Sequence, residues 1–185
     1  LLTADEYKRL QQPEPQHTRP IPLGIPHRCQ FGEGADARRN DCGAACVAMI
    51  VAGLRGKQTT VDEIAIGYQK RPNAYMGFWE LMVALRAYKL APDYVRPLRA
   101  NRICEALDNG KPVIVLVKYP QLPYKASTFT GSHFMVIYGY SDDEFYYHDP
   151  LACDGEIRKI SSSDLELAMS EFDPGENLPY QGLIV

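Results

Sequence analysis

The spacing of hydrophobic positions changes midway along the chain, from helical spacing in the first half to short continuous or alternating runs in the second. The longest nearly apolar stretch, residues 44–54, is apolar almost all round and predicts a buried helix. Asp41 stands where an N-cap belongs, and Gly53 and Gly56 mark the end of the helix. Cys42 is therefore expected in the first turn.

Four further helices and five strands are expected around this helix. The polar turn Ser141-Asp142-Asp143 joins two of the strands into a hairpin, and Thr60 to Glu63 resembles a capping box. Helices followed by an antiparallel sheet predict an α+β domain. The helices are expected at about residues 60–68, 78–88, 101–108 and 164–172, the last capped by Ser161 or Ser163, and the strands at 113–117, 133–140, 144–148, 157–160 and 182–185.

The first 40 residues differ in composition from the rest of the chain. Residues 1–28 contain five prolines and are expected to lie as an extended strap on a domain formed by residues 29–185. The small, polar run 32–40 predicts a loop. The chain opens on Leu1 and Leu2, without Met and without an apolar signal region, so we expect it to be trimmed or excised from something longer. Secreted and cytoplasmic locations both stay open.

Composition narrows the classes of function. The chain has 185 residues, of which 45% are hydrophobic and 23% charged, as in one ordinary globular domain. Its 20 Lys and Arg and 23 Asp and Glu give a net charge of −3 without a basic stripe, which leaves nucleic-acid binding no electrostatic basis. No apolar stretch approaches the ~20 residues needed to span a bilayer. A nucleic-acid partner and a membrane-spanning segment are therefore not expected.

Cys42, His133 and Asp149 form a candidate catalytic triad. A thiol attacks carbonyl groups as the thiolate, which the first turn of a helix favours, and Gly43 lets a substrate backbone come close. His133 begins one strand of the expected hairpin and Asp149 follows the other, so the two should be neighbours. Cys, His and Asp in this order, on an early helix and a late sheet, are typical of papain-like enzymes.

Three sequence blocks follow one another along the chain: NDCGAACVAMIVAG, NGKPVIVLVKY and GSHFMVIYGYSDDEFYYHDP. In this order they resemble the bacteriocin-processing, double-glycine peptidase family of the papain-like clan, and the resemblance covers about residues 28–160. The resemblance implies a papain-like fold and a cysteine peptidase that acts on a peptide or protein substrate without metal or organic cofactor, with a preference for small residues such as Gly before the cut. It makes Cys42 the nucleophile, His133 the general base and then acid, and Asp149 the orienting carboxylate.

The family also has a Gln before the nucleophile whose side-chain amide completes the oxyanion hole, and Gln30 is the matching residue. It stands 12 residues before Cys42, a longer interval than is usual in the family. The extra residues belong to the polar loop, and closing a slightly longer loop costs only tenths of a kcal/mol. We therefore expect the loop to bulge outward while Gln30 keeps its place.

Other Cys and His residues compete for these roles. Cys46, one helical turn after the candidate nucleophile, has apolar neighbours that predict a core position. His148 precedes Asp149 directly, but neighbours in a strand point to opposite faces, so it is expected to face away from the nucleophile helix. His17 and His27 lie in the proline-rich strap and are expected to be solvated.

The remaining cysteines have no evident partner. Five Cys at irregular spacing argue against a full disulfide framework and leave at least one thiol free. Cys29, Cys104 and Cys153 are interpreted as inert, with a disulfide between any two left open. A zinc site of Cys29, Cys42, Cys46 and a His is chemically adequate, but its intervals fit no ordinary zinc module.

Three alternatives stay open. Trp79, just ahead of a helix, belongs either to a substrate groove or to the core, and core packing is the preferred interpretation. The same triad can transfer an acyl group to an amine rather than to water. The chain can also be a catalytically idle peptide-binding module, although such relatives typically lose the Cys that is intact here as Cys42.

Overall fold

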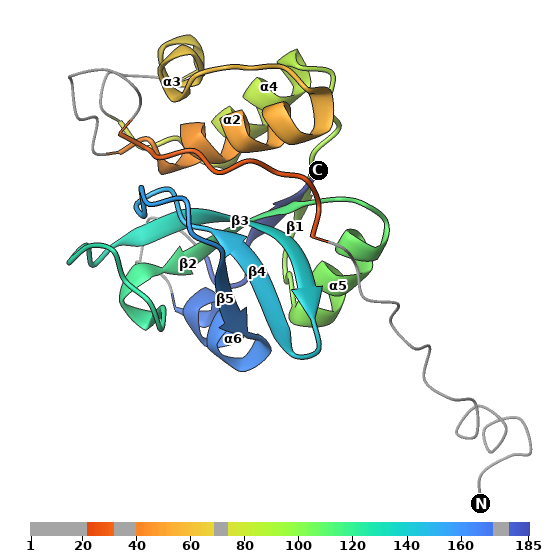
Figure 1. Ribbon diagram of the computed structural model, residues 1–185, viewed down its shortest axis with the longest axis vertical. Helices are drawn as coiled ribbons and strands as arrows, with labels where there is room; N and C mark the ends of the chain where they lie inside the picture. Colours follow the sequence, from red (N-terminus) through yellow and green to blue (C-terminus); the bar gives the residue numbers. More distant parts are fainter. Residues whose placement is uncertain (1–21, 32–39, 69–73, 172–177) are drawn as a thin grey trace, which may run out of the picture.

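The computed structural model describes residues 22–31, 40–68, 74–171 and 178–185, and most of the predicted strap and of the 32–40 loop lies outside these ranges. The described chain forms a six-stranded sheet with helices on both faces (Figure 1). All strand pairs are antiparallel, which confirms the predicted α+β class. The strand order is β1-β6-β2-β3-β4-β5, with β1 Asp93–Val95, β2 Val113–Lys118, β3 Ser132–Ser141, β4 Glu144–His148, β5 Arg158–Ser161 and β6 Gly182–Ile184.

The helices form one layer on each side of this sheet (Figure 1). One layer holds α2 (Cys42–Arg55), α3 (Val61–Tyr68) and α4 (Phe78–Ala87). The other holds α5 (Ala100–Asp108) and α6 (Ser162–Ser170), and the short 3-10 helix η1 (Tyr119–Gln121) follows β2. Covering both faces buries the central strands, which explains why β2 is a continuous apolar run instead of an alternating one. Within the described ranges, no helix has the length and apolar character needed to cross a bilayer.

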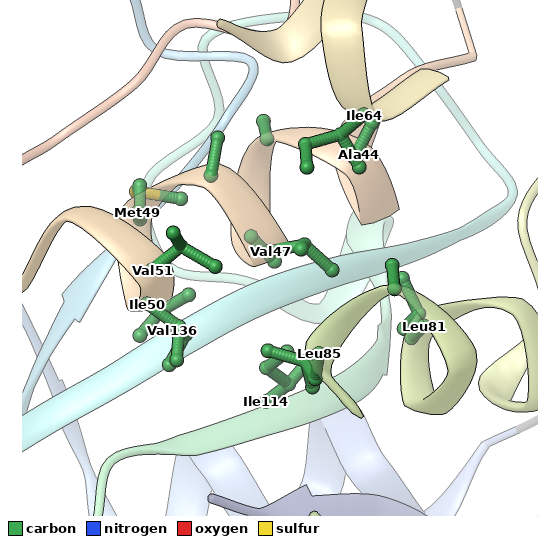
Figure 2. Packing of buried hydrophobic residues seen from close by; sticks show 14 of the residues in the cluster. Ala44, Val47, Met49, Ile50, Val51, Ile64, Leu81, Leu85, Ile114 and Val136 are labelled. Carbon is green, nitrogen blue, oxygen red and sulfur yellow. The ribbon is translucent and has the colours of Figure 1, made fainter. Parts of the chain in front are cut away.

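Helix α2 forms the centre of the core between the sheet and the first layer. Its residues 42–52 are all buried, and small Ala side chains let neighbouring elements approach closely. Val47 and Ile50 lie over Val136 of β3, with Ile114 and Leu85 beside them (Figure 2). The helix ends at Gly56, which adopts the left-handed conformation with φ 62°. This glycine was predicted to mark the end of the helix. The position of the first turn of α2 is thus set by apolar packing.

Most predicted elements are confirmed, and the differences are local. Thr60 and Glu63 form the capping box, with the Thr60 N–H donating to Glu63 Oε2 at 2.9 Å and the Glu63 N–H donating to Thr60 Oγ1 at 3.1 Å. Ser161 caps α6. The hairpin turn is tighter than predicted, because Ser141 pairs with Glu144 and only two residues remain in the turn. The sequence analysis missed β1 and η1, each of only three residues.

The lead-in segment, defined as residues 22–31, runs alongside α2 between the helical layer and the sheet (Figure 1). The Leu23 N–H donates to the Tyr138 carbonyl of β3 at 2.7 Å. Two glycines allow the close approach: a Cβ at Gly139 would lie 2.9 Å from the backbone of Pro22, and a Cβ at Gly53 would lie 3.1 Å from that of Ile25. The missing side chains of these two glycines therefore leave room for the backbone of the lead-in segment.

We expect Gly139→Ala to destabilise the protein by about 1–3 kcal/mol, because the added methyl overlaps the backbone of Pro22 rather than a movable side chain. Gly67→Ala is the matched control, since nothing lies within 4 Å of a Cβ there and Ala is the better helix former. Chemical denaturation should show a lower free energy of unfolding for the first variant and an equal or higher one for the second. Equal stability of both variants would mean that the lead-in segment does not pack on β3 as described.

Candidate active site

Cys42 is the first residue of α2 and is 6% exposed. Asp41 occupies the predicted N-cap position, although its side chain makes no capping hydrogen bond to the helix. The first turn carries no acidic residue, so the positive potential of its N–H groups is available to a thiolate. The apolar packing of α2 therefore holds a thiol at the end of the helix that favours its reactive form.

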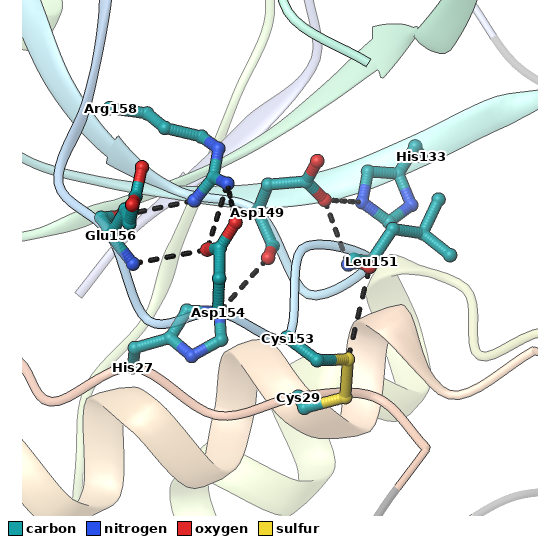
Figure 3. Close-up of a disulfide and its surroundings, with 9 residues drawn as sticks. All are labelled: His27, Cys29, His133, Asp149, Leu151, Cys153, Asp154, Glu156 and Arg158. Atoms are coloured by element: carbon teal, nitrogen blue, oxygen red, sulfur yellow. Dashed lines mark hydrogen bonds and ion pairs between the residues drawn. A yellow bond between two sulfur atoms is a disulfide. The ribbon is translucent and has the colours of Figure 1, made fainter. Parts of the chain in front are cut away.

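His133 and Asp149 lie side by side, as the predicted hairpin requires. His133 is the second residue of β3, Asp149 follows β4, and His133 Nε2 is 2.8 Å from Asp149 Oδ1 (Figure 3). The imidazole also hydrogen-bonds to Cys42, for which Nδ1 is the remaining ring nitrogen. Burial opposes the charge on His133, but the hydrogen bonds to Asp149 and Cys42 and the negative charges of both raise its pKa to about 9. The structure thus brings all three predicted residues together.

Tyr119, which the sequence analysis missed, is a further neighbour of this pair. Its hydroxyl donates to Asp149 Oδ2 at 3.2 Å, and its fully buried ring meets the His133 ring edge-on at 5.1 Å. The Leu151 N–H donates to Asp149 Oδ1 at 2.8 Å. Burial opposes the charge on Asp149, but the bonds to His133, Leu151 and Tyr119 hold its carboxyl pKa below the ordinary value. The fully buried carboxylate is therefore kept ionised by three hydrogen bonds, from His133, Tyr119 and Leu151.

Two cavities meet at Cys42. The larger has a volume of about 640 Å³ and is walled by the start of α4 and by β3, with Phe78 and Phe134 among its lining residues. The smaller, of about 390 Å³, is lined by His133 and Gln30. Cys42 lines both of them. An extended chain laid through the two cavities would pass directly over the thiol.

Gln30 lines the smaller cavity together with Cys42 and His133, despite its longer distance along the chain. It is 2% exposed, and its backbone N–H donates to the Pro150 carbonyl at 2.8 Å, directly after Asp149. The chain between Phe31 and Asn40, where the outward bulge is predicted, lies outside the described residues.

The rival thiols are less suited to attack. Cys46 is fully buried in α2, and this burial, with the nearby charges of Cys42 and Asp149, raises its pKa well above the ordinary value. Burial also raises the pKa of Cys104, on α5 at the opposite face of the sheet, to about 11. The prediction that Cys46 belongs to the core is confirmed.

Two predictions for His residues are wrong. His27 is half-buried rather than solvated, because its Nε2 hydrogen-bonds to the Asp149 carbonyl at 3.0 Å. His148 lies opposite Val136, on the face that α2 covers, and not on the face away from it. It stacks on Tyr138 at 4.2 Å, and its Nε2 lies 2.7 Å from the Ile25 carbonyl. Neighbouring strand residues do point to opposite faces, but His148 is on the face that the prediction excluded for it. His17 lies outside the described residues.

Cys29 and Cys153 form a disulfide that joins the lead-in segment to the loop after β4 (Figure 3). The sequence analysis left this pairing open among three cysteines. Cys42, Cys46 and Cys104 carry free thiols, which agrees with the prediction of at least one. Because its sulfur is in this disulfide, Cys29 is not available as a ligand for the zinc site of Cys29, Cys42, Cys46 and a His.

Trp79 is 64% exposed, so the preferred interpretation of core packing is wrong. The residues just before it, Met76 to Phe78, line the larger cavity instead. Trp79 itself points out of α4, one residue beyond the part that reaches the cavity.

The sequence profile of the Peptidase_C39 like family matches residues 13–172. No curated protein matches the chain. Solved structures similar to it include a Bacillus anthracis protein described as a C39-like peptidase, with a TM-score of 0.58 and 14% identity over 92% of this chain and 96% of that one. A double-glycine motif protease from an AMS/PCAT transporter, solved with its leader peptide, has a TM-score of 0.58 and 18% identity over 88% and 91% of the two chains.

The peptidase domain of Streptococcus ComA, a bifunctional ABC transporter of a quorum-sensing pathway, has a TM-score of 0.55 and 18% identity over 86% of this chain and 96% of that one. At such identities the likeness shows the fold, which is that of papain-like C39 peptidase domains.

The electrostatics of the site predict widely separated pKa values for the imidazoles of His133 and His148. His133 should remain protonated up to about pH 9, whereas burial lowers the pKa of His148 to about 4. In Asp149→Asn the pKa of His133 should fall, because burial is then opposed by Cys42 but no longer by the carboxylate, while that of His148 should stay near 4. NMR titration of the ring Cε1–H signals measures both. A His133 pKa near 6.5 in the unaltered protein would contradict this electrostatic account.

Proposed function

We propose that this chain, which belongs to the Peptidase_C39 like family, is a papain-like cysteine peptidase that cleaves peptide bonds through Cys42, His133 and Asp149. The observation that carries the proposal is the position of His133, which bonds Asp149 at 2.8 Å and also bonds Cys42 where two cavities meet. A thiol, an imidazole and an orienting carboxylate in this order are what nucleophilic acyl chemistry needs.

The resting site holds an imidazolium beside the Cys42 sulfur. Because its pKa is raised to about 9, His133 carries a proton at neutral pH, and it hydrogen-bonds to Cys42 at the first turn of α2. Asp149 Oδ1 binds Nε2 of the ring, which leaves Nδ1 for the bond to Cys42. A positive charge and the N–H groups of the first turn thus lie beside the sulfur that attacks as the thiolate.

Attack of Cys42 Sγ on the substrate carbonyl carbon moves an electron pair onto the carbonyl oxygen. The backbone N–H of Cys42 and the side-chain amide of Gln30 are the proposed donors to this oxyanion, since both residues line the smaller cavity. His133 Nδ1–H then gives its proton to the leaving amine, the C–N bond breaks, and an acyl group stays on the sulfur.

Water completes the cycle. His133, now neutral, takes a proton from a water molecule, and the resulting hydroxide attacks the thioester carbonyl. The C–S bond breaks, which releases the acid product and restores the thiolate and the imidazolium.

The substrate is proposed to be an extended peptide with small residues next to the cleaved bond. Tyr75 and Phe129 line both cavities, as Cys42 does, so a bulky side chain in either cavity would compete with two aromatic rings for space. The family resemblance points the same way, and the similar AMS/PCAT protease is a double-glycine motif protease solved with a leader peptide.

Cys42→Ala should abolish cleavage of quenched fluorescent peptides with a central Gly-Gly pair, while Cys46→Ala, which removes a buried thiol from the same helix, should retain most of the rate. Iodoacetamide at neutral pH should label Cys42 first, as shown by peptide mapping.

The rate of peptide cleavage should fall as the pH rises through about 9, because the imidazolium then loses the proton that the leaving amine needs.

Equal activity of the Cys42→Ala variant would overturn the nucleophile. An amide product that forms only with an added amine would identify an acyltransferase. Tight peptide binding without any product would identify an idle binding module.

A further inference from the structure

Three links join the lead-in segment to the loop after β4 and are here called the clamp. Two of them are drawn in Figure 3: the Cys29–Cys153 disulfide, between residues 124 apart in the sequence, and His27 Nε2 at 3.0 Å from the Asp149 carbonyl. The third is the Gln30 N–H donating to the Pro150 carbonyl at 2.8 Å. The same four-residue stretch, 27–30, provides one side of all three links. The clamp therefore fixes the part of the chain that ends in the proposed oxyanion donor.

Gln30 depends on such tertiary links because it belongs to no helix or strand. Residues 22–29 form no regular secondary structure, so no ladder of backbone hydrogen bonds sets the position of Gln30. Its side chain is nevertheless 2% exposed and lines the cavity that holds Cys42 and His133. The disulfide, one residue before Gln30, is the covalent member of the clamp.

Asp149 depends on the clamp far less. Its carboxylate is held by His133, Tyr119 and Leu151, none of which belongs to the lead-in segment. Opening the disulfide should therefore loosen Gln30 and leave the His133–Asp149 pair in place.

We propose that the Cys29–Cys153 disulfide is a positioning element of the oxyanion hole, which acts through Gln30 and makes full peptidase activity require one oxidised cysteine pair beside one reduced cysteine. The inference rests on the proposed peptidase function. Cys29 and Cys153 hold the donor, and Cys42 must stay a thiol to attack. Disulfides form and persist in oxidising compartments, so this is where the clamp would assemble.

A dithiol reductant opens the disulfide of the clamp in two exchange steps. One reductant thiolate attacks a sulfur of the disulfide and forms a mixed disulfide, and the second thiolate displaces the protein sulfur. The protein pair gains two electrons and two protons as two thiols, and the dithiol is oxidised to a cyclic disulfide. Cys153 lies in an exposed part of the loop, so a small dithiol can reach the bond.

A double-mutant cycle tests whether the disulfide acts through Gln30. We expect Gln30→Ala to lower kcat by about 10²–10³-fold, the usual effect of losing one oxyanion donor. Cys29→Ala/Cys153→Ala should lower kcat by about 10-fold, because two links of the clamp remain, with little change in KM. The variant with all three substitutions should match Gln30→Ala within about 3-fold, since a donor that is absent cannot be mispositioned.

The alkylation of Cys42 by iodoacetamide separates positioning from general damage. This reaction forms no oxyanion, so its rate should be the same with and without the disulfide. Cys104→Ala is the matched control, because it removes a free thiol on the opposite face of the sheet and should leave kcat unchanged.

Multiplicative losses in the cycle, a slower alkylation of Cys42, or an unchanged kcat without the disulfide would each overturn the positioning role. If the double Cys variant fails to fold, graded dithiothreitol treatment of the unaltered protein replaces it, and kcat should fall in proportion to the free Cys29 thiol measured by mass spectrometry. A constant kcat after complete reduction would contradict the inference. If the unaltered protein cleaves no peptide and Cys42 is not labelled first, the proposed function itself fails.

Discussion

The burial of α2 between the sheet and its neighbouring helices is the interaction on which the rest of the structure depends. All residues from Cys42 to Ala52 are buried, so the helix can shift neither along nor about its axis without losing apolar contacts. Its first turn is thereby fixed near the beginning of β3, where His133 lies. A reactive thiol at a defined distance from an imidazole is thus a consequence of core packing. The polar groups contribute direction and charge to an arrangement that apolar contacts have already set.

Burying the charged groups next to this helix requires close pairing. An unpaired carboxylate in the interior is unfavourable, yet Asp149 is fully buried and ionised because donors face both of its oxygens. The same bonds fix the orientation of His133 and keep its pKa high. The sheet contributes to this pairing through Tyr119. This residue begins η1 directly after β2, and its hydroxyl donates to the Asp149 carboxylate. The electrostatic and geometric requirements of the site are therefore met by the same contacts.

The sequence was informative wherever a local pattern determines structure. The apolar helix that begins at Cys42, the capping box at Thr60 and the hairpin that pairs His133 with Asp149 all follow from residue spacing. It was least informative for contacts between distant segments. The Cys29–Cys153 pairing and the bond of Tyr119 to Asp149 depend on how loops return to the sheet, which periodicity does not encode.

The face occupied by His148 shows the same limit. Alternation correctly separated it from Asp149, but only the packing of the layers decides which face α2 covers. Trp79 is a similar case, because helical spacing does not tell which side of a short surface helix stays exposed.

The central claim is that Cys42 attacks a peptide carbonyl whose oxygen is received by the smaller cavity. A crystal structure with a peptide aldehyde ending in glycinal tests it most directly, because the aldehyde forms a thiohemiacetal that imitates the tetrahedral intermediate. The account predicts a covalent bond from Cys42 Sγ to the aldehyde carbon, with the new oxygen ~3 Å from both the Cys42 backbone nitrogen and Gln30 Nε2. An adduct on another cysteine, or an oxygen that points away from both donors, would contradict it.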